Sequence, residues 1–194
     1  MAASCAERGY AQASVEDVLE RSGLSRGCFG RHFADKQDCA LAAVDEILAE
    51  TTRAVANAHS PELADWQRLL GATRALLELL AARPSHARLA CIEARGAMPA
   101  EAYERYAAGI RVIVAMLDRA RGYAAGGAPP TAGRAAIGGA ELLIRRELIA
   151  GRADRLPELL PDIIYGTVVP FLPQSEALRY ARLAREPARD GGVR

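Results

Sequence analysis

Residues 23–33 read Gly-Leu-Ser-Arg-Gly-Cys-Phe-Gly-Arg-His-Phe, and they decide the fold of the first part of the chain. Gly23 can adopt the left-handed backbone conformation that ends a helix. The hydroxyl of Ser25 can then accept a backbone hydrogen bond and cap a short helix from Arg26 to about Phe33. The stretch therefore predicts a tight turn followed by a short helix.

A helix is also predicted immediately before this turn. Ser14 and Asp17 have the spacing of a capping box, in which a hydroxyl and a carboxylate three residues later bond the free amides that open a helix. That helix should run from Val15 to about Ser22. Apolar residues are spaced to form the small core of a helix-turn-helix between the two helices, namely Val18, Leu19, Leu24, Phe29 and Phe33.

The rest of the 194 residues also has helical periodicity. No stretch alternates β-branched and polar residues over the length of a strand, so the fold is predicted to be all-α. Asp35 can cap a long helix that extends to the vicinity of His59. Further helices are expected over about 61–83, 85–95, 99–121, 131–150 and 157–172, with a Gly- and Pro-rich loop over 122–130.

Composition places the chain among ordinary globular proteins. Hydrophobic residues make up 51% and charged residues 25%, which is not the composition of a disordered or fibrous protein. The net charge of +1 does not by itself indicate a polyanionic partner. The cysteines lack the spacing of zinc ligands, so no metal or cofactor is expected. Because neither a membrane-length apolar run nor a signal peptide is present, we expect a cytoplasmic protein.

The second helix of a helix-turn-helix enters the major groove of DNA, so its polar side chains are candidates for contacts with bases. The residues expected to face base edges or nearby phosphates are Arg26, Cys28 and Arg31, and those expected near the DNA backbone are Ser14, Ser25, His32 and Lys36. These residues are the candidate DNA-binding set.

Several residue pairs around this unit follow a family pattern. They are Gly9-Tyr10, Ser14-Val15, Gly23-Leu24-Ser25, Gly27, His32-Phe33 and Lys36. In this pattern the chain resembles the DNA-binding domain of the TetR family. The resemblance implies a three-helix DNA-binding domain joined by a long helix to a C-terminal helical domain that binds an effector and dimerises. It also adds Gly27 to the candidate DNA-binding set.

The chain departs from the family pattern at three places. Gly30 stands where the family usually has a tyrosine that contacts a phosphate, and Cys28 replaces a threonine. Two glycines in one short helix cost it about 1 kcal/mol each. Met1 falls inside the expected first helix, so that helix is truncated.

We expect three regions along the chain. Residues 1–40 form the helix-turn-helix domain, residues 41–173 form the effector-binding and dimerisation domain, and residues 174–194 form a flexible tail because of Gly191-Gly192 and scattered charges. Candidate effector-binding residues are Trp66, Arg74, Cys91, Arg95, Tyr103, Tyr106, Ile110 and Met116, although the same residues could equally fill a core. Candidate dimer-interface residues are Ile137, Gly138, Ala140, Ile144, Ile163, Ile164 and Val168, for which packing within one chain is the alternative.

The sequence thus favours a bacterial transcriptional regulator, a repressor that binds a palindromic operator as a homodimer and is released by a small, largely apolar effector. The departures at Gly30 and in the first helix motivate an alternative, a ligand-binding dimer that has lost operator binding. Residues 23–27 also match the G-x-S-x-G pattern of hydrolases. That pattern requires a strand before the serine, and here a helix is predicted, so we expect no enzyme.

Overall fold

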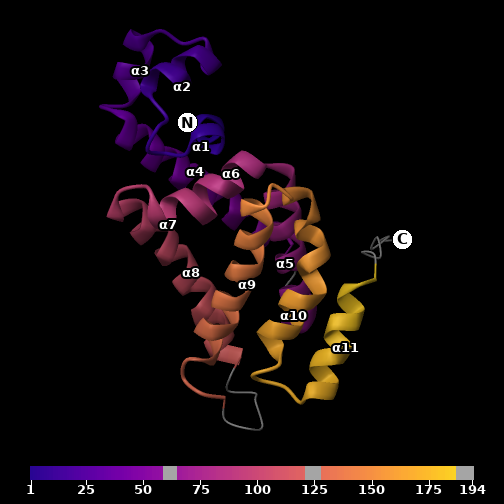
Figure 1. Cartoon of the computed structure of the whole chain (residues 1–194). Coiled ribbons are helices and arrows are strands. Elements are labelled where there is room, and N and C mark those ends of the chain that lie inside the picture. The colour runs from indigo at the N-terminus through magenta and orange to yellow at the C-terminus, as the bar shows by residue number, and fades with distance from the viewer. Residues whose placement is uncertain (59–64, 121–127, 187–194) are drawn as a thin grey trace.

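The computed structural model describes residues 1–58, 65–120 and 128–186, with the backbone alone at residues 65 and 116–120. Every regular element in these residues is a helix, so the predicted all-α fold is confirmed. Figure 1 shows a small group of helices at one end of the long helix α4 (Lys36–Asn57) and a bundle of helices beyond it.

The small group contains α1 (Ala2–Arg8), α2 (Val15–Ser22) and α3 (Arg26–His32). The bundle contains α5 (Asp65–Ala82), α8 (Ala100–Ala120), α9 (Ala132–Ile149), the 3-10 helix η3 (Ala153–Leu159), α10 (Leu160–Val168) and α11 (Gln174–Ala184). Between α5 and α8 the chain forms α6 (Pro84–Arg88), the π-helical turn η1 (Leu89–Glu93) and α7 (Ala94–Gly96).

The predicted caps of the N-terminal helices are confirmed. The amide of Asp17 donates to Ser14 Oγ at 3.1 Å and the amide of Ser14 donates to Asp17 Oδ2 at 2.8 Å, which completes the capping box. Gly23 ends α2 with φ 68° and ψ 12°. Ser25 and Asp35 likewise accept a backbone N–H in the first turn of α3 and α4. Local sequence therefore sets the ends of these helices.

The core between α2 and α3 is smaller than the sequence predicts. Phe29 is buried and its ring centroid lies 5.3 Å from that of Phe33. Val18 and Leu19 are half-buried. Leu24 is 51% exposed, so its prediction as a core residue is wrong. It lies in the turn between the two helices, and its side chain is exposed to solvent.

Two predicted helices of the bundle are interrupted. The helix expected over 85–95 is divided into α6, η1 and α7. The helix expected over 157–172 begins as η3 and becomes α-helical only from Leu160, because Pro161 fits the first turn of a helix, where an N–H is not needed. It ends at Val168, just before Pro170, since proline has no N–H to donate to the next helical hydrogen bond.

The flexible tail expected over 174–194 is wrong for residues 174–184. These residues form α11, which packs along α10. The ring of Tyr180 stacks on that of Trp66 with centroids 5.3 Å apart, so aromatic contact with α5 fixes the helix. Residues 187–194 lie outside the described part of the chain.

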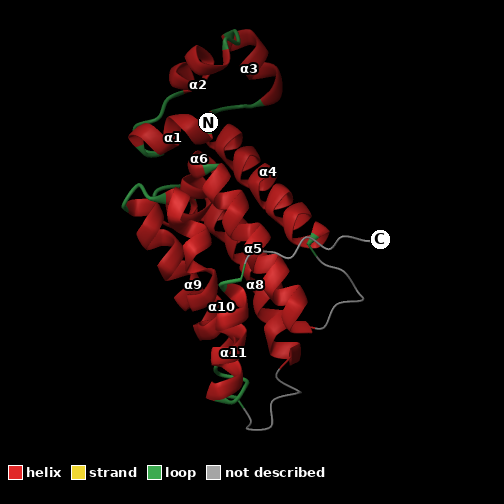
Figure 2. Ribbon diagram, turned by 90° about the vertical axis from the view of Figure 1, so that its right-hand side faces the viewer, coloured by secondary structure: helices red, strands yellow, loops and turns green. Residues whose placement is uncertain are grey.

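The core of the bundle surrounds α5, which packs against α4, α10 and η3. The most completely buried large side chains of this core are Leu77, Leu89, Leu148, Leu156 and Val44. Helix α1 packs on α6 and η1, as Figure 2 also shows, so the N-terminal group contacts the bundle directly. None of the described helices combines the length and apolar character needed to cross a membrane.

Candidate nucleic-acid interface and effector site

Helix α3 lies at the outer end of the molecule (Figure 1). Arg26, Arg31 and His32 are exposed, and Cys28 is half-buried. Side chains exposed on one short helix can reach the edges of bases in a major groove. The structure therefore brings these four candidate residues together on one projecting element.

The two glycines of α3 leave its surface open. A Cβ at Gly30 would meet no heavy atom within 4 Å, and one at Gly27 would meet only Ser25 Oγ, at 4.0 Å. Ser14 and Ser25 use their hydroxyl oxygens as helix caps, so their first role is to fix the ends of α2 and α3. Packing therefore does not require a glycine at position 30, and its lack of a side chain leaves a gap in the exposed surface of α3.

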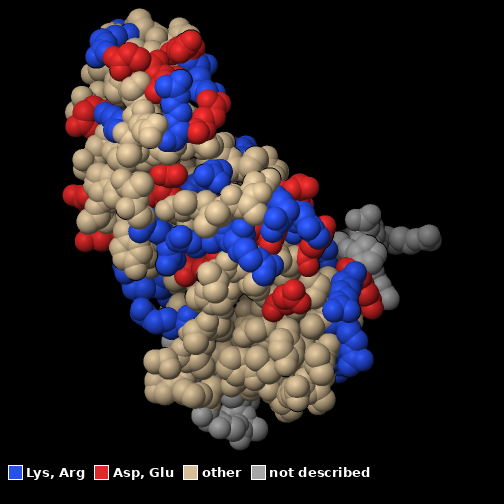
Figure 3. All heavy atoms as spheres, in the orientation of Figure 1, with Lys and Arg blue, Asp and Glu red and all other residues tan. Residues whose placement is uncertain are grey.

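Acidic residues accompany the arginines of this unit. Figure 3 shows both signs of charge at the outer end of the molecule. Arg26 forms an ion pair with Glu16, and Arg21 with Glu7. Arg31 has no ion pair among the described residues. Arg26 and Arg21 are therefore already paired with carboxylates in the free chain.

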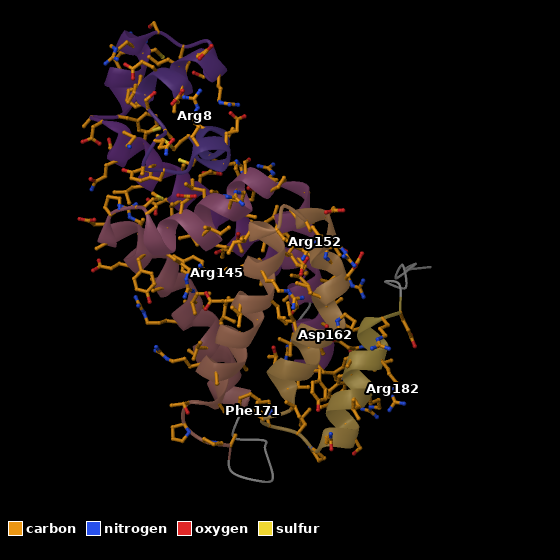
Figure 4. The ribbon with its side chains drawn as sticks, viewed as in Figure 1. Arg8, Arg145, Arg152, Asp162, Phe171 and Arg182 are labelled. Atoms are coloured by element: carbon orange, nitrogen blue, oxygen red, sulfur yellow. The ribbon has the colours of Figure 1, made fainter. Side chains whose placement is uncertain are left out.

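Asp17 also pairs with a basic residue. Arg8, labelled in Figure 4, lies at the end of α1, and its NH1 is 3.4 Å from Asp17 Oδ1. Hydrogen bonds from the hydroxyl and backbone of Ser14 lower the pKa of Asp17, and the charge of Arg8 lowers it further. The carboxylate is therefore charged at neutral pH and its contacts connect α1 to α2.

Lys36 lies within the unit and does not project from it. Its Nζ donates to the carbonyl oxygens of Tyr10 at 3.1 Å and Ala11 at 3.4 Å. The same Nζ lies 4.4 Å from the centroid of the Tyr10 ring, a cation–π distance. This lysine, which is predicted from the sequence to lie near the DNA backbone, thus binds the loop between α1 and α2.

Three of the candidate effector residues come together beside α9. Arg95 NH1 lies 2.7 Å from Oε1 of Glu141, and the Tyr106 hydroxyl donates to the same oxygen. The Arg95 guanidinium lies 5.5 Å from the centroid of the Tyr106 ring. Cys91 is buried beside this group, and the Glu141 charge acts on its thiol. We call these four residues the polar cluster.

Burial is the main cause of the raised pKa values in the polar cluster. It raises the pKa of the Cys91 thiol to about 12, and the charge of Glu141 contributes in the same direction. Burial also raises the pKa of the Tyr106 hydroxyl. Both groups are therefore protonated at neutral pH, with Tyr106 as a donor to the Glu141 carboxylate. A ligand that reached this place would have to replace one of these internal bonds.

Glu141 was not a sequence-predicted site residue. The signal that could have identified it is its position as the one charged residue among residues 135–144. A carboxylate in an apolar stretch of helix needs a buried partner. The partner itself, Arg95, lies in a separate helix, so the pairing depends on the tertiary fold.

The other predicted effector residues do not join the polar cluster. Trp66 stacks on Tyr180, and Arg74 NH2 donates to the Glu186 carbonyl at 3.1 Å, so both lie against α11 and the residues after it. Tyr103 is 48% exposed and Ile110 is half-buried on α8. The side chain of Met116 lies outside the described part of the chain. The predicted set is therefore divided between separate places.

Most of the predicted dimer residues lie inside the chain's own core. Ile144, Ile163, Ile164 and Val168 are at most 8% exposed, because α9 and α10 pack on each other and α10 packs on α5 and α11. Their assignment to a dimer interface is corrected accordingly. Ile137 and Ala140 are half-buried, whereas Gly138 is exposed. The exposed apolar side chains of α9 are instead Leu142, 68% exposed, and Ile149, 62% exposed.

Comparisons with known proteins agree with this architecture. Residues 2–43 match the family model of bacterial regulatory proteins, tetR family. A bacterial regulatory protein in the tetR family from Rhodococcus RHA1 is 18% identical, with a TM-score of 0.54 over 94% of this chain and 90% of that one. The fatty acid degradation regulator FadR from Bacillus halodurans is 18% identical, with a TM-score of 0.51 over 100% and 95%. No curated protein matches the chain.

At this level of identity the solved structures show a shared fold, while the family model matches the N-terminal residues alone. The matched segment contains α1, α2 and α3 and the beginning of α4. Residues 2–43 therefore match the N-terminal domain of the tetR family of bacterial regulatory proteins, and the chain shares its overall fold with a solved protein of that family.

Proposed function

We propose that the chain is a cytoplasmic transcriptional regulator, a repressor that binds a palindromic operator as a homodimer and is released by a small, largely apolar effector. The observation that carries the proposal is α3, a capped helix that exposes Arg26 and Arg31 within the segment that matches the family model. In a two-fold dimer, two such helices would read half-sites about one turn of DNA apart. No enzymatic activity is proposed.

The test is selection of bound duplexes from a random pool at low salt. A palindrome is expected among the selected sequences. Arg31→Ala should then weaken binding to the selected duplex by about 1–3 kcal/mol, the range for a base contact. Arg111→Ala removes the same charge from an exposed position on α8 and should leave the affinity unchanged. Equal losses of affinity in the two variants would show that Arg31 makes no specific contact with the duplex.

The exposed apolar face of α9 supports dimerisation. Gly138, Leu142 and Ile149 are separated by four and seven residues and therefore lie on one face of the helix; all three are exposed. We propose that this face, rather than the buried isoleucines, meets the second copy. Leu142→Arg should convert the dimer into a monomer in analytical ultracentrifugation. A dimer that persists in this variant would place the interface elsewhere.

The polar cluster supports an effector with an apolar body and one polar end. Arg95 or Glu141 could exchange its internal partner for that end, while the apolar body would displace surrounding core side chains. One structural relative is a fatty acid degradation regulator, so decanoate is a suitable probe. Decanoate should release the selected duplex from the wild type and fail to release it from Arg95→Met. Release from both proteins would exclude Arg95 as the carboxylate-binding residue.

A second candidate function is that of a ligand-binding dimer without operator binding. Gly30, which removes a phosphate contact expected from the family, and the paired arginines Arg21 and Arg26 favour it. The same duplex selection distinguishes the two functions, because this candidate predicts no enriched sequence.

A further inference from the structure

Glu93 is a buried carboxylate of the bundle whose partner belongs to the N-terminal group. It lies in the π-helical turn η1 and is 7% exposed. Its Oε2 accepts a hydrogen bond from the backbone N–H of Tyr10 at 2.9 Å. Tyr10 lies in the loop that leads from α1 to α2, so this bond joins the bundle to the segment that carries the helix-turn-helix.

The backbone of Gly9 directs this bond. Gly9 has φ 75° and ψ 157°, a conformation that is essentially restricted to glycine. A Cβ at this position would lie 3.9 Å from both carboxylate oxygens of Glu93. The loop therefore approaches Glu93 closely, and the glycine allows the chain to turn so that the next N–H points at the carboxylate.

Lys36 fixes the same loop from the opposite end. As described above, its Nζ donates to the Tyr10 carbonyl and lies over the Tyr10 ring. Tyr10 is itself only 8% exposed. Glu93 of the bundle thus binds the N–H of Tyr10. Lys36, the first residue of α4, binds the carbonyl and the ring of the same residue. This arrangement fixes where α2 begins relative to the bundle.

A contribution to stability does not by itself explain why Glu93 is buried at this position. A buried carboxylate without an ion pair is unfavourable, and Glu93 makes no ion pair within residues 1–58, 65–120 and 128–186. Glu147 provides the contrast, because it is 5% exposed and is bonded by the Nε atoms of Arg146 and Arg152. Single π-turns in α-helices frequently occur at functional sites, and Glu93 is the last residue of such a turn.

We propose that Glu93 is a positioning residue for operator binding, which orients α2 and α3 by bonding the N–H of Tyr10. This inference rests on the proposed operator binding. The segment 89–96 also carries Cys91 and Arg95 of the polar cluster, so a ligand that displaced Arg95 would move the short segment that bears Glu93. The orientation of the helix-turn-helix is thereby linked to the state of the polar cluster.

The experiment compares full-length Glu93→Ala with Glu93→Gln, which keeps an oxygen acceptor without the charge. Binding to the selected duplex should weaken about tenfold in Glu93→Ala, the effect of leaving a buried donor without its partner, and should recover to within about threefold of wild type in Glu93→Gln. Glu147→Ala removes an equally buried carboxylate inside the bundle. It should lower the melting temperature and leave duplex affinity unchanged.

Amide exchange of Tyr10 provides a readout that needs no DNA. Its N–H should exchange about tenfold faster in Glu93→Ala and at nearly the wild-type rate in Glu93→Gln. If Glu93→Ala does not fold, Gly9→Ala disturbs the same bond from the loop and should give the same losses.

Unchanged duplex affinity in Glu93→Ala would overturn the inference, as would unchanged Tyr10 exchange. A loss in Glu147→Ala as large as that in Glu93→Ala would also overturn it, since the effect would then be one of general stability. A wild-type chain that selects no duplex contradicts the proposed function itself. That failure is separable, because Tyr10 exchange reports the Glu93 bond without DNA.

Discussion

The hairpin of α2 and α3 and the bundle around α5 are stabilised in different ways. Helix α2 has no buried residue and α3 has one, Phe29. The bundle instead contains large side chains with almost no exposed surface, among them Leu77 and Leu156. The hairpin therefore depends on caps, a turn glycine and a few apolar contacts, whereas the bundle depends on burial. We infer that the hairpin is the part of the molecule that bound DNA would order most.

The largest contrast is expected between two leucines. Leu156→Ala removes a side chain that is 0% exposed and should reduce the free energy of unfolding by about 2–5 kcal/mol. Leu24→Ala removes one that is 51% exposed and should change it by less than about 0.5 kcal/mol. Urea denaturation of both variants measures the difference. Similar losses would show that Leu24 belongs to a core and would contradict the comparison.

Removal of a cap should act on the hairpin alone. Ser25→Ala deletes the acceptor for the Cys28 amide and should destabilise α3 by about 1 kcal/mol. Amide exchange in α3 should increase, while exchange in α10 stays at the wild-type rate. Ser175→Ala is the control, because that serine is exposed on α11 and caps no helix. Faster exchange throughout the bundle would mean that the two regions unfold together.

Two glycines of the hairpin should respond with opposite signs. Gly30→Ala places a methyl group in open space and should stabilise α3 by about 0.5–1 kcal/mol, the difference in helix propensity. Gly23→Ala forces a side chain onto a backbone with φ 68° and should destabilise the turn by about 1–2 kcal/mol. Local exchange of α3 amides measures both effects. The same sign in both variants would contradict the geometry of the turn.

The smallest effect on stability is expected at an exposed ion pair. Arg26 and Glu16 are 71% and 64% exposed, so Glu16→Gln should change the free energy of unfolding by less than about 1 kcal/mol. It should nevertheless strengthen binding to DNA, because Arg26 gains freedom to meet phosphate and a negative charge is removed. Fluorescence anisotropy with the selected duplex tests this against Glu104→Gln on α8. Stronger binding in Glu104→Gln but not in Glu16→Gln would contradict the assignment of α3 as the element that binds DNA.

The features that sequence predicts correctly are local. Ser14, Gly23, Ser25 and Asp35 act through the backbone of their own turns, so their spacing is sufficient to place the ends of the N-terminal helices. Sequence does not predict the exposure of Leu24, because an apolar residue beside a turn can face either side of a hairpin and its burial depends on the tertiary arrangement.

The candidate sites beyond the hairpin needed the tertiary fold. Periodicity identifies apolar faces of α9 and α10 but not which face a second copy would cover, so it does not separate buried residues such as Ile163 from interface residues. Glu93 and Glu141 pair with Tyr10 and Arg95, which are distant from them in sequence. No spacing rule connects such partners.

The most direct test that α3 binds DNA is hydrogen exchange of the full chain with and without the selected duplex. Bound DNA should slow exchange of the amides of residues 26–33 most strongly, while amides around the buried Leu156 and Ile164 should exchange as in the free protein. Protection that is absent from residues 26–33, or that is strongest in the bundle, would contradict the assignment of α3 as the element that binds DNA.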